Sequence, residues 1–261
     1  MKAQLSHMRQ VILSVCSLAL VCSVAAQAKE GTITYERKIN LHRRLKDEQM
    51  KAMMPEFRTN KQQLLFSDSI CVYKAVEEEN APDPFEGGGA PGGSPGGPGG
   101  GQRMGPPPGM PGQNNVLYIN FSNLKIVEQT ELGEKTFLIA DTVKVQPWKL
   151  SDETKTVLNY PCKKAALKTL RGQEVVAWYT ESIITPAGPE MFNGLPGAVL
   201  QVDVNDGEML FTALEVSNKV DKKALKEPAK GKATTREEYN KKIQEMFNNR
   251  GPGGPRMIQI N

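Results

Sequence analysis

Histidine is almost absent from this sequence, which has two in 261 residues. Downstream of residue 28 the one histidine is His42, flanked by basic residues in a composition typical of a solvated turn. A Ser-His-Asp or Cys-His site would need His42 near a serine or near Cys162, and no spacing indicates this. Asp203, Asp206 and Glu208 could pair as acid and base, but a polar hairpin tip explains them without any chemistry. The sequence therefore predicts no catalytic residue.

Clustered metal ligands are also lacking. A zinc site needs three or four clustered histidine, cysteine or aspartate ligands, and the sequence shows no such group. Met50, Met53 and Met54 are bunched and would suit a soft metal such as copper. Methionine also fills hydrophobic cores adaptably, so a core position is the favoured interpretation. We expect no metal site and no cofactor, with copper binding as a weaker alternative.

Charge of one sign is not concentrated anywhere in the chain. The formal net charge is +4, and residues 1–28 hold two of the 33 basic residues and none of the 29 acidic ones, which leaves 31 − 29 = +2 for the remainder. Nucleic-acid binding requires a clustered basic face, so this class of partner is excluded. Apolar runs of about 20 residues are missing too, so no transmembrane span is expected after residue 28.

The N-terminus has the pattern of a secretory signal peptide. Lys2 and Arg9 precede an apolar run at residues 11–24, and small residues allow cleavage after Ala26 or Ala28. Residues 1–28 are therefore expected to be removed on export to the periplasm, to the outer membrane or to the medium. A lipoprotein interpretation would acylate Cys22, but the preceding residue is a valine where a small residue is preferred.

Cysteine is scarce once the signal peptide is removed. Cys71 and Cys162 remain, and two cysteines in an oxidising compartment can form a disulfide. The sequence gives no distance between them, so two separate buried thiols are an equal alternative.

Glycine and proline are concentrated in one segment. Between residues 87 and 112, 20 of 26 residues are Gly or Pro, which leaves almost nothing apolar to bury. The glycines follow no strict triplet period, so collagen is excluded. We interpret residues 82–115 as a disordered insertion in a domain spanning residues 29–220, and as an enlarged connection between the two strands of a hairpin.

Outside that segment, apolar residues alternate with period two, which indicates β-strands joined by short polar turns. Long helical periods between the strands are missing, which argues against parallel βαβ units. The prediction is a mainly β protein with a curved antiparallel sheet, a bowl or half-barrel of about nine strands, and two peripheral helices. The expected strands are residues 31–39, 62–76, 116–121, 125–130, 135–140, 143–150, 156–167, 174–182, 198–204 and 209–216.

Two segments have helical patterns. Residues 45–54 place their methionines on one apolar face, and Pro55 ends the helix. Residues 235–249 begin with Thr235 and Glu238, spaced as a capping box. The second helix belongs to a C-terminal extension, residues 221–261, which ends in a flexible tail.

Gly194, Leu195, Pro196 and Gly197 precede the strand at residues 198–204. Pro196 presets φ for the first central position of a type II turn, and Gly197 tolerates a positive φ at the second. A phosphate-binding loop would place its glycines before a helix, so that interpretation fails. The motif is expected to be a structural turn.

The order of several short motifs resembles the GLPGLI family, a group of exported proteins from Bacteroidetes. The resemblance covers roughly residues 30–217, with Ala198, Val199 and Leu200 standing where Leu-Ile-Leu is usual. The motifs are Gly31-Thr-Ile-Thr-Tyr35, Trp148, Glu153-Thr-Lys155, Tyr160-Pro-Cys162, Ala177-Trp-Tyr-Thr180, Gly188-Pro189 and Phe192-Asn-Gly-Leu-Pro-Gly197.

The resemblance implies a fold and no activity. Domains related to this family look like shallow β bowls, one of which resembles the N-terminal domain of a secreted peptide N-glycosidase, and they are also similar to the half-barrels of periplasmic lipoprotein carriers. Fold analogy of this kind carries no function by itself. Cys162 matches a family position and Cys71 does not, which weakens the disulfide hypothesis.

Four aromatic residues are the candidate binding residues: Trp148, Trp178, Tyr179 and Phe192. They would line the concave face of the curved sheet, or else belong to its ordinary core. The favoured hypothesis is a non-enzymatic binding module for an apolar, peptide or envelope-protein partner. The alternative is a hydrolase, or an accessory domain of one, that acts on glycans or peptides; two close carboxylates in a deep pocket would favour it.

Overall fold

The computed structural model describes residues 28–45, 47–76, 115–133, 135–170 and 172–248. The expected signal peptide, except Ala28, and the Gly/Pro-rich insertion, except Asn115, lie outside the described residues, as does the C-terminal tail. No helix in the described ranges is long and apolar enough to cross a membrane.

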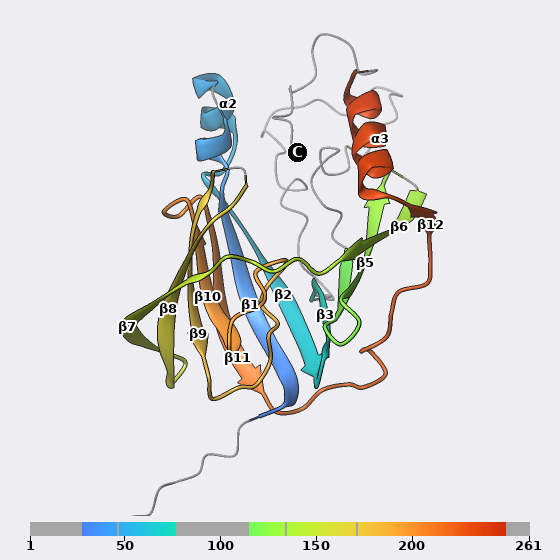
Figure 1. Cartoon of the computed structure of the whole chain (residues 1–261). Coiled ribbons are helices and arrows are strands. Elements are labelled where there is room, and N and C mark those ends of the chain that lie inside the picture. The colour runs from blue at the N-terminus through green and yellow to red at the C-terminus, as the bar shows by residue number, and fades with distance from the viewer. Residues whose placement is uncertain (1–27, 46, 77–114, 134, 171, 249–261) are drawn as a thin grey trace, which may run out of the picture.

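The fold is mainly β, as predicted, with one large open sheet (Figure 1). Twelve strands follow one another in the order β12-β6-β5-β4-β3-β2-β1-β11-β10-β9-β8-β7. All neighbouring pairs are antiparallel except β12 with β6. The elements are β1 (Glu30–Asn40), η1 (His42–Arg44), α2 (Glu48–Met53), β2 (Phe57–Ser67), β3 (Ile70–Ala75), β4 (Val116–Asn120), β5 (Lys125–Leu132), β6 (Lys135–Thr142), β7 (Lys149–Val157), β8 (Tyr160–Lys168), β9 (Glu174–Thr180), β10 (Ala198–Val204), β11 (Met209–Ser217), β12 (Lys232–Thr234) and α3 (Arg236–Asn248).

The strand count differs from the prediction because two expected strands are hairpins and because β12 was not expected. Residues 62–76 turn at Asp68, which has φ 49°, and residues 156–167 turn at Leu158 and Asn159, with φ 48° and 66°. Apolar alternation continues through such tight turns, so the pattern does not reveal them. The expected strand at residues 143–150 is wrong over residues 143–148, which form a connection, and β7 begins at Lys149.

The flanks of the Gly/Pro-rich segment are neighbours in the sheet. β3 ends at Ala75, β4 begins at Val116, and the two strands pair antiparallel with Lys74 opposite Val116. This is the arrangement expected of a hairpin connection, in which the ends already lie together and a long loop adds little closure entropy.

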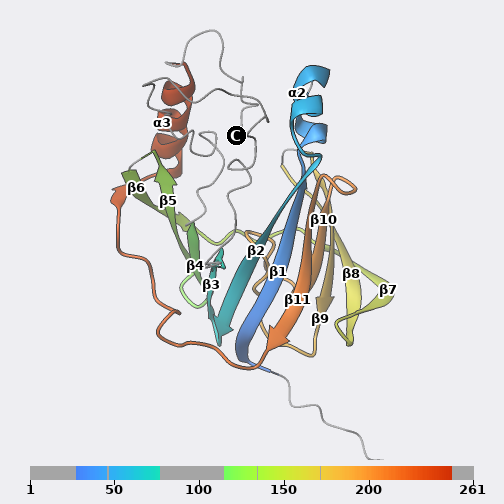
Figure 2. The same ribbon diagram turned by 180° about the vertical axis from the view of Figure 1, so that it is seen from behind.

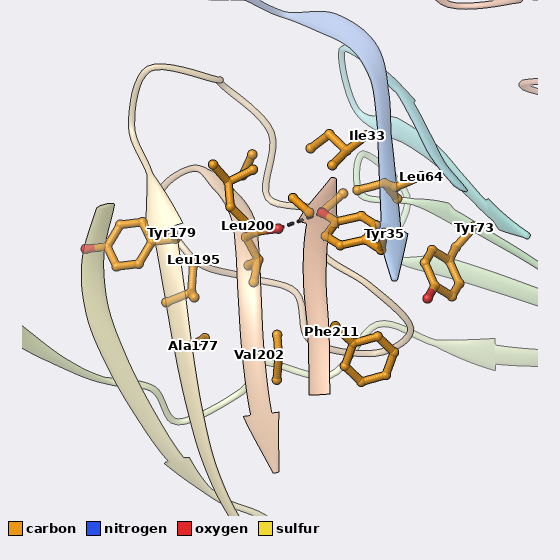
Figure 3. Close-up of a cluster of buried hydrophobic side chains, with 14 of the residues drawn as sticks. Ile33, Tyr35, Leu64, Tyr73, Ala177, Tyr179, Leu195, Leu200, Val202 and Phe211 are labelled. Atoms are coloured by element: carbon orange, nitrogen blue, oxygen red, sulfur yellow. Dashed lines mark hydrogen bonds between the residues drawn. The ribbon is translucent and has the colours of Figure 1, made fainter. Parts of the chain in front are cut away.

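The main core lies on one face of the sheet, which we call the covered face. Two connections cross it, residues 143–148 and 181–197, and they lie on the same side of the strands in both views (Figures 1 and 2). Ile183 and Leu195 from the second connection pack with sheet residues such as Ile33. Tyr35 fixes the arrangement, because its hydroxyl donates to the carbonyl of Val199 at 2.6 Å (Figure 3).

The opposite face carries a smaller apolar cluster. Val72, Tyr118 and Val127 form it, and Leu225 from the segment between β11 and β12 packs against it. The C-terminal extension thus touches both faces, because α3 contributes Tyr239, whose ring lies edge-on to Phe137 with centroids 5.6 Å apart.

Both helices form where the sequence predicts them, but only one of them packs as expected. Helix α3 has the expected capping box: the amide of Glu238 donates to Thr235 Oγ1 at 3.1 Å, and the Glu238 carboxylate lies 3.5 Å from the Thr235 amide. Helix α2 is short, and its expected apolar face is wrong. Met54 packs against the core, whereas Met50 is exposed and 86% of the surface of Met53 is accessible to solvent. Six residues cannot bury a face without another element beside them.

The disulfide hypothesis is wrong. Cys71 and Cys162 are both free and buried, the first in β3 and the second in β8, with five strands between them in the sheet order. Burial raises the pKa of the Cys71 thiol to about 12, so it behaves as a core side chain.

Candidate functional site

The four aromatic residues predicted to share a surface do not gather on one. Trp178 and Tyr179 are consecutive in β9, so they point to opposite faces. Tyr179 is buried in the core on the covered face, while Trp178 faces the other way, with Lys155 Nζ 4.2 Å from its ring centroid. Trp148 and Phe192 belong to the connections on the covered face: Trp148 Nε1 donates to the Asn193 carbonyl at 2.9 Å, and Phe192 lies edge-on to Phe211.

The Gly-Leu-Pro-Gly motif is structural, but it is not a type II turn. The glycine with positive φ is Gly194, at 89°, and Gly197 has no positive φ. The amide of Ala198 donates to the carbonyl of Ile183 at 3.1 Å rather than closing a turn on Leu195. Gly197 is needed for a different reason, since a Cβ there would overlap the carbonyl of Thr180. Leu195 is buried in the core and anchors the connection.

The acidic group at the β10–β11 turn also has a structural role. Asp203 accepts from the amide of Gly207 at 2.7 Å, and Glu208 pairs with Arg44 at 3.1 Å. Arg43 donates to the carbonyl of Asp206 at 2.7 Å. These contacts attach η1 to the turn.

His42 is structural as well. Its Nε2 donates to the carbonyl of Met54 at 2.9 Å and so holds the end of α2. The described ranges contain no group of three histidine, cysteine or acidic residues that could hold a metal ion.

A polar group that the sequence analysis missed lies on the covered face. Arg37 follows Ile33 and Tyr35 in the alternation of β1, so it points to the same face as the core. Its Nε lies 2.9 Å from Glu190 Oε1, and the side chains of Arg37 and Glu190 are 17% and 34% exposed. The guanidinium also stands 5.8 Å from the ring centroid of Phe211. The signal in the sequence was the arginine itself, a charge where the pattern calls for an apolar residue.

Glu190 is held in an unusual conformation. Its φ is 50°, a value that few residues other than glycine, asparagine and aspartate adopt. Burial raises the pKa of its carboxyl group, Arg37 opposes this, and the negative charge of Glu128 adds to the increase. Strained backbone and a shifted pKa at one residue are typical of functional positions.

Three buried side-chain atoms of the described residues have no hydrogen-bond partner, and one of them, Arg37 Nε, belongs to this ion pair. Tyr73 is 6% exposed, and none of the described residues makes a hydrogen bond with its hydroxyl. The same holds for Arg37 Nε, which is near Glu190 but not aligned for a hydrogen bond, and for Asn115 Oδ1. Burial raises the pKa of Tyr73 strongly, and the charges of Glu190 and Arg37 both act on it, so the three side chains share one environment. Buried polar atoms without partners are rare in native proteins.

The strand register extends the group across the sheet. Tyr73 pairs with Leu117, which pairs with Glu128, so Tyr73 and Glu128 lie on the same face. Arg236 of α3 donates to Glu128 at 2.6 Å. The group therefore holds two arginine–glutamate pairs whose charges cancel, together with unsatisfied donors and acceptors. Both carboxylates are engaged by arginines, so among the described residues of this group neither is a free nucleophile.

Comparison with known proteins finds a family match to part of the chain and solved structures of similar fold. The family described as "N-glycanase peptide, N-terminal domain" matches residues 110–240, which is 131 of the 261 residues. Two solved structures of a protein titled PNGF-II, in space groups C2 and P21, each match with a TM-score of 0.55 and 16% identity over 84% of this chain. The chain spans about a third of their length, 34%. No curated protein matches the chain.

The role of Gly197 can be tested against Gly194. In Gly197→Ala the added methyl meets the backbone of β9, which must move, so we expect the free energy of unfolding to fall by about 3 kcal/mol. Gly194→Ala has open space and a strained φ alone, and should lose about 1 kcal/mol. Urea melts of both variants measure this; equal losses would contradict the close-approach explanation.

The Glu190 environment predicts a pH dependence of stability. Because its folded pKa is above the ordinary value of 4.5, the folded state binds more protons than the unfolded state between the two values, and the wild type loses stability as pH rises through that window. Glu190→Gln cannot ionise. Its unfolding free energy relative to wild type should therefore increase as the pH rises above 4.5. Parallel pH profiles in urea melts would show that Glu190 is not buried as described.

Proposed function

This chain belongs to the family of N-glycanase peptide N-terminal domains, and from that membership we propose that it is a non-enzymatic module associated with glycan processing, which binds its ligand on the covered face of the sheet around Arg37. The observation that carries the proposal is the buried Tyr73 hydroxyl, which has no hydrogen-bond partner among the described residues and shares its environment with the Arg37–Glu190 ion pair. A ligand that supplies this hydrogen bond would gain what the hydroxyl loses on burial.

The arrangement of the carboxylates supports binding rather than hydrolysis. A glycosidase-type site needs one free carboxylate and one protonated carboxyl group across the scissile bond. Glu190 and Glu128 are each engaged in an ion pair with an arginine, Arg37 and Arg236, so neither is the free carboxylate that such a site needs. A hydrolase, or an accessory domain acting on glycans or peptides, is the second candidate, because PNGF-II shares the fold.

Binding of a glycopeptide separates the two candidates. We expect the purified protein to bind an N-glycosylated peptide more tightly than the same peptide without its glycan, as measured by calorimetry, and to leave the glycan attached, as measured by mass spectrometry. Release of the glycan would favour the hydrolase, and equal or undetectable binding of both peptides would overturn the proposal.

We further propose that the protein is exported to the periplasm or the outer membrane and belongs with the GLPGLI-type proteins. The supporting features are the N-terminal pattern of the sequence and the buried Leu195 of the motif. Ala28 supports cleavage after Ala26, because it forms a bridge with Ile183 and its carbonyl accepts from the amide of Ile184 at 2.8 Å.

The exported protein should therefore begin at Gln27 and keep the Ala28 bridge. N-terminal sequencing of the envelope fraction checks this. A protein that begins at Met1 or Lys29, or one that carries a lipid on Cys22, would contradict the assignment.

A further inference from the structure

An apolar patch is exposed at the tip of the β1–β2 hairpin, on a helix that projects beyond the sheet (Figures 1 and 2). Met53 in α2 is 86% exposed, and Met50 and Phe57 are each 39% exposed. Met50 and Met53 are three residues apart, so they lie on the same side of the helix. Lys38 Nζ lies 4.1 Å from the Phe57 ring centroid, so the two methionines are the open part of the patch. We call Met50, Met53 and Phe57 the tip patch.

Two carboxylates flank the methionines of the tip patch. Asp47 precedes α2 and accepts from a backbone amide of the helix at 2.8 Å, and Glu56 follows α2 and accepts from an asparagine side chain of β1 at 3.1 Å. Both donors are uncharged, so these contacts leave the two negative charges in place. The acidic residue between them, Glu48, is already paired with Lys51 at 2.7 Å. A partner that fits the tip patch is therefore apolar, with a positive charge next to its apolar residues.

The C-terminal tail, residues 249–261, has this chemistry. It contains Met257, Ile258 and Ile260 directly after Arg256, and it has no acidic residue. Residues 251–255 are all glycine or proline, so a spacer without large side chains separates α3 from the apolar end. Although the tail lies outside the described residues, its composition is therefore complementary to that of the tip patch and its flanking carboxylates.

The tail is also long enough to reach the tip patch. It begins after Asn248, the last residue of α3, and α3 packs on β6 through Tyr239 and Phe137. Four strand spacings separate β6 from β2, which follows α2 in the chain, and at about 4.8 Å each they amount to about 19 Å. The segment 249–257 spans up to about 30 Å when extended. Helices α2 and α3 stand at the same end of the sheet in both views (Figures 1 and 2), so the tail does not have to pass around the sheet.

We propose that residues 257–260 dock on the tip patch of the same molecule. Ile258 and Ile260 cover the exposed methionines, whose flexible side chains adapt to a partner, and Arg256 lies next to the flanking carboxylates. Because a tether of this length gives an effective concentration on the order of 1 mM, an affinity as weak as about 0.1 mM keeps the tail docked for about nine-tenths of the time. The contact connects α3 to the β1–β2 hairpin and covers apolar surface that α2, which has no buried residue, cannot bury by itself.

Oxidation of Met53 by hydrogen peroxide tests the contact in the full chain. The thioether sulfur takes one oxygen atom from the peroxide and water is released, and a covered sulfur reacts more slowly than an exposed one. In the double variant Ile258→Asp with Ile260→Asp the tail cannot cover the patch, so Met53 should oxidise about tenfold faster than in wild type. Peptide mass spectrometry measures the rate. Met191, which is 40% exposed on the connection at residues 181–197, should oxidise equally fast in both proteins.

Charge reversal provides a second variant with a matched control. Arg256→Glu should also speed the oxidation of Met53, because it places a negative charge next to Asp47 and Glu56. Lys230→Glu makes the same change at an exposed position between β11 and β12, and it should leave the rate at the wild-type value. Equal rates of Met53 oxidation in wild type and the double variant overturn the proposal. Protection that disappears on dilution shows that a second molecule covers the patch, which overturns the contact within one chain.

Discussion

The pairing of β1 with β11 is the interaction on which the rest of the structure depends. Strands β1 to β6 and strands β7 to β11 each form a run of sequential neighbours, and the pairing of residues 32–39 of β1 with β11 joins the two runs into one sheet. The connection at residues 181–197 comes from the second run and packs on residues of the first. Tyr35 reaches Val199 and Arg37 reaches Glu190 only because this register holds.

The covered face serves as core and as candidate site at once, and these two roles make opposite demands. An ion pair in such a position is often no more stabilising than well-packed apolar residues of similar volume. Keeping Arg37 there, opposite a glutamate with φ 50°, therefore reduces stability without an evident structural benefit. Natural proteins accept such local conflicts mainly where recognition requires them.

Apolar alternation in the sequence predicted the mainly β architecture, and the spacing of Thr235 and Glu238 predicted the start of α3. Both are local properties of the chain. The turn at Leu158 and Asn159 was not predicted, because a two-residue turn does not interrupt the alternation of apolar and polar residues. The positive φ expected at Gly197 belongs to Gly194. Gly197 instead allows a close approach to Thr180, which depends on the pairing of β10 with β9 and is not visible in the local sequence.

The candidate site was harder to predict from the sequence than the strands and helices. Nothing near Glu190 in the sequence shows that it meets Arg37, because eight strands, β2 to β9, lie between the two residues in the chain. The aromatic residues were chosen by type, and Trp178 and Tyr179 had to diverge once β9 formed. Arg37 was visible as a break in the pattern of β1, but a broken pattern does not reveal its partner.

The open sheet ends at β7, which pairs with β8 and with no other strand in the described part of the chain. An unpaired edge of this length is a template on which a second molecule can add its own strand. Along β7 the side chains of Lys149, Asp152, Glu153 and Lys155 carry charges of both signs. Stacking two such edges would force charges into contact and desolvate them. The composition of β7 therefore protects the protein from aggregation in a crowded compartment, at the border where the sheet would otherwise continue to grow.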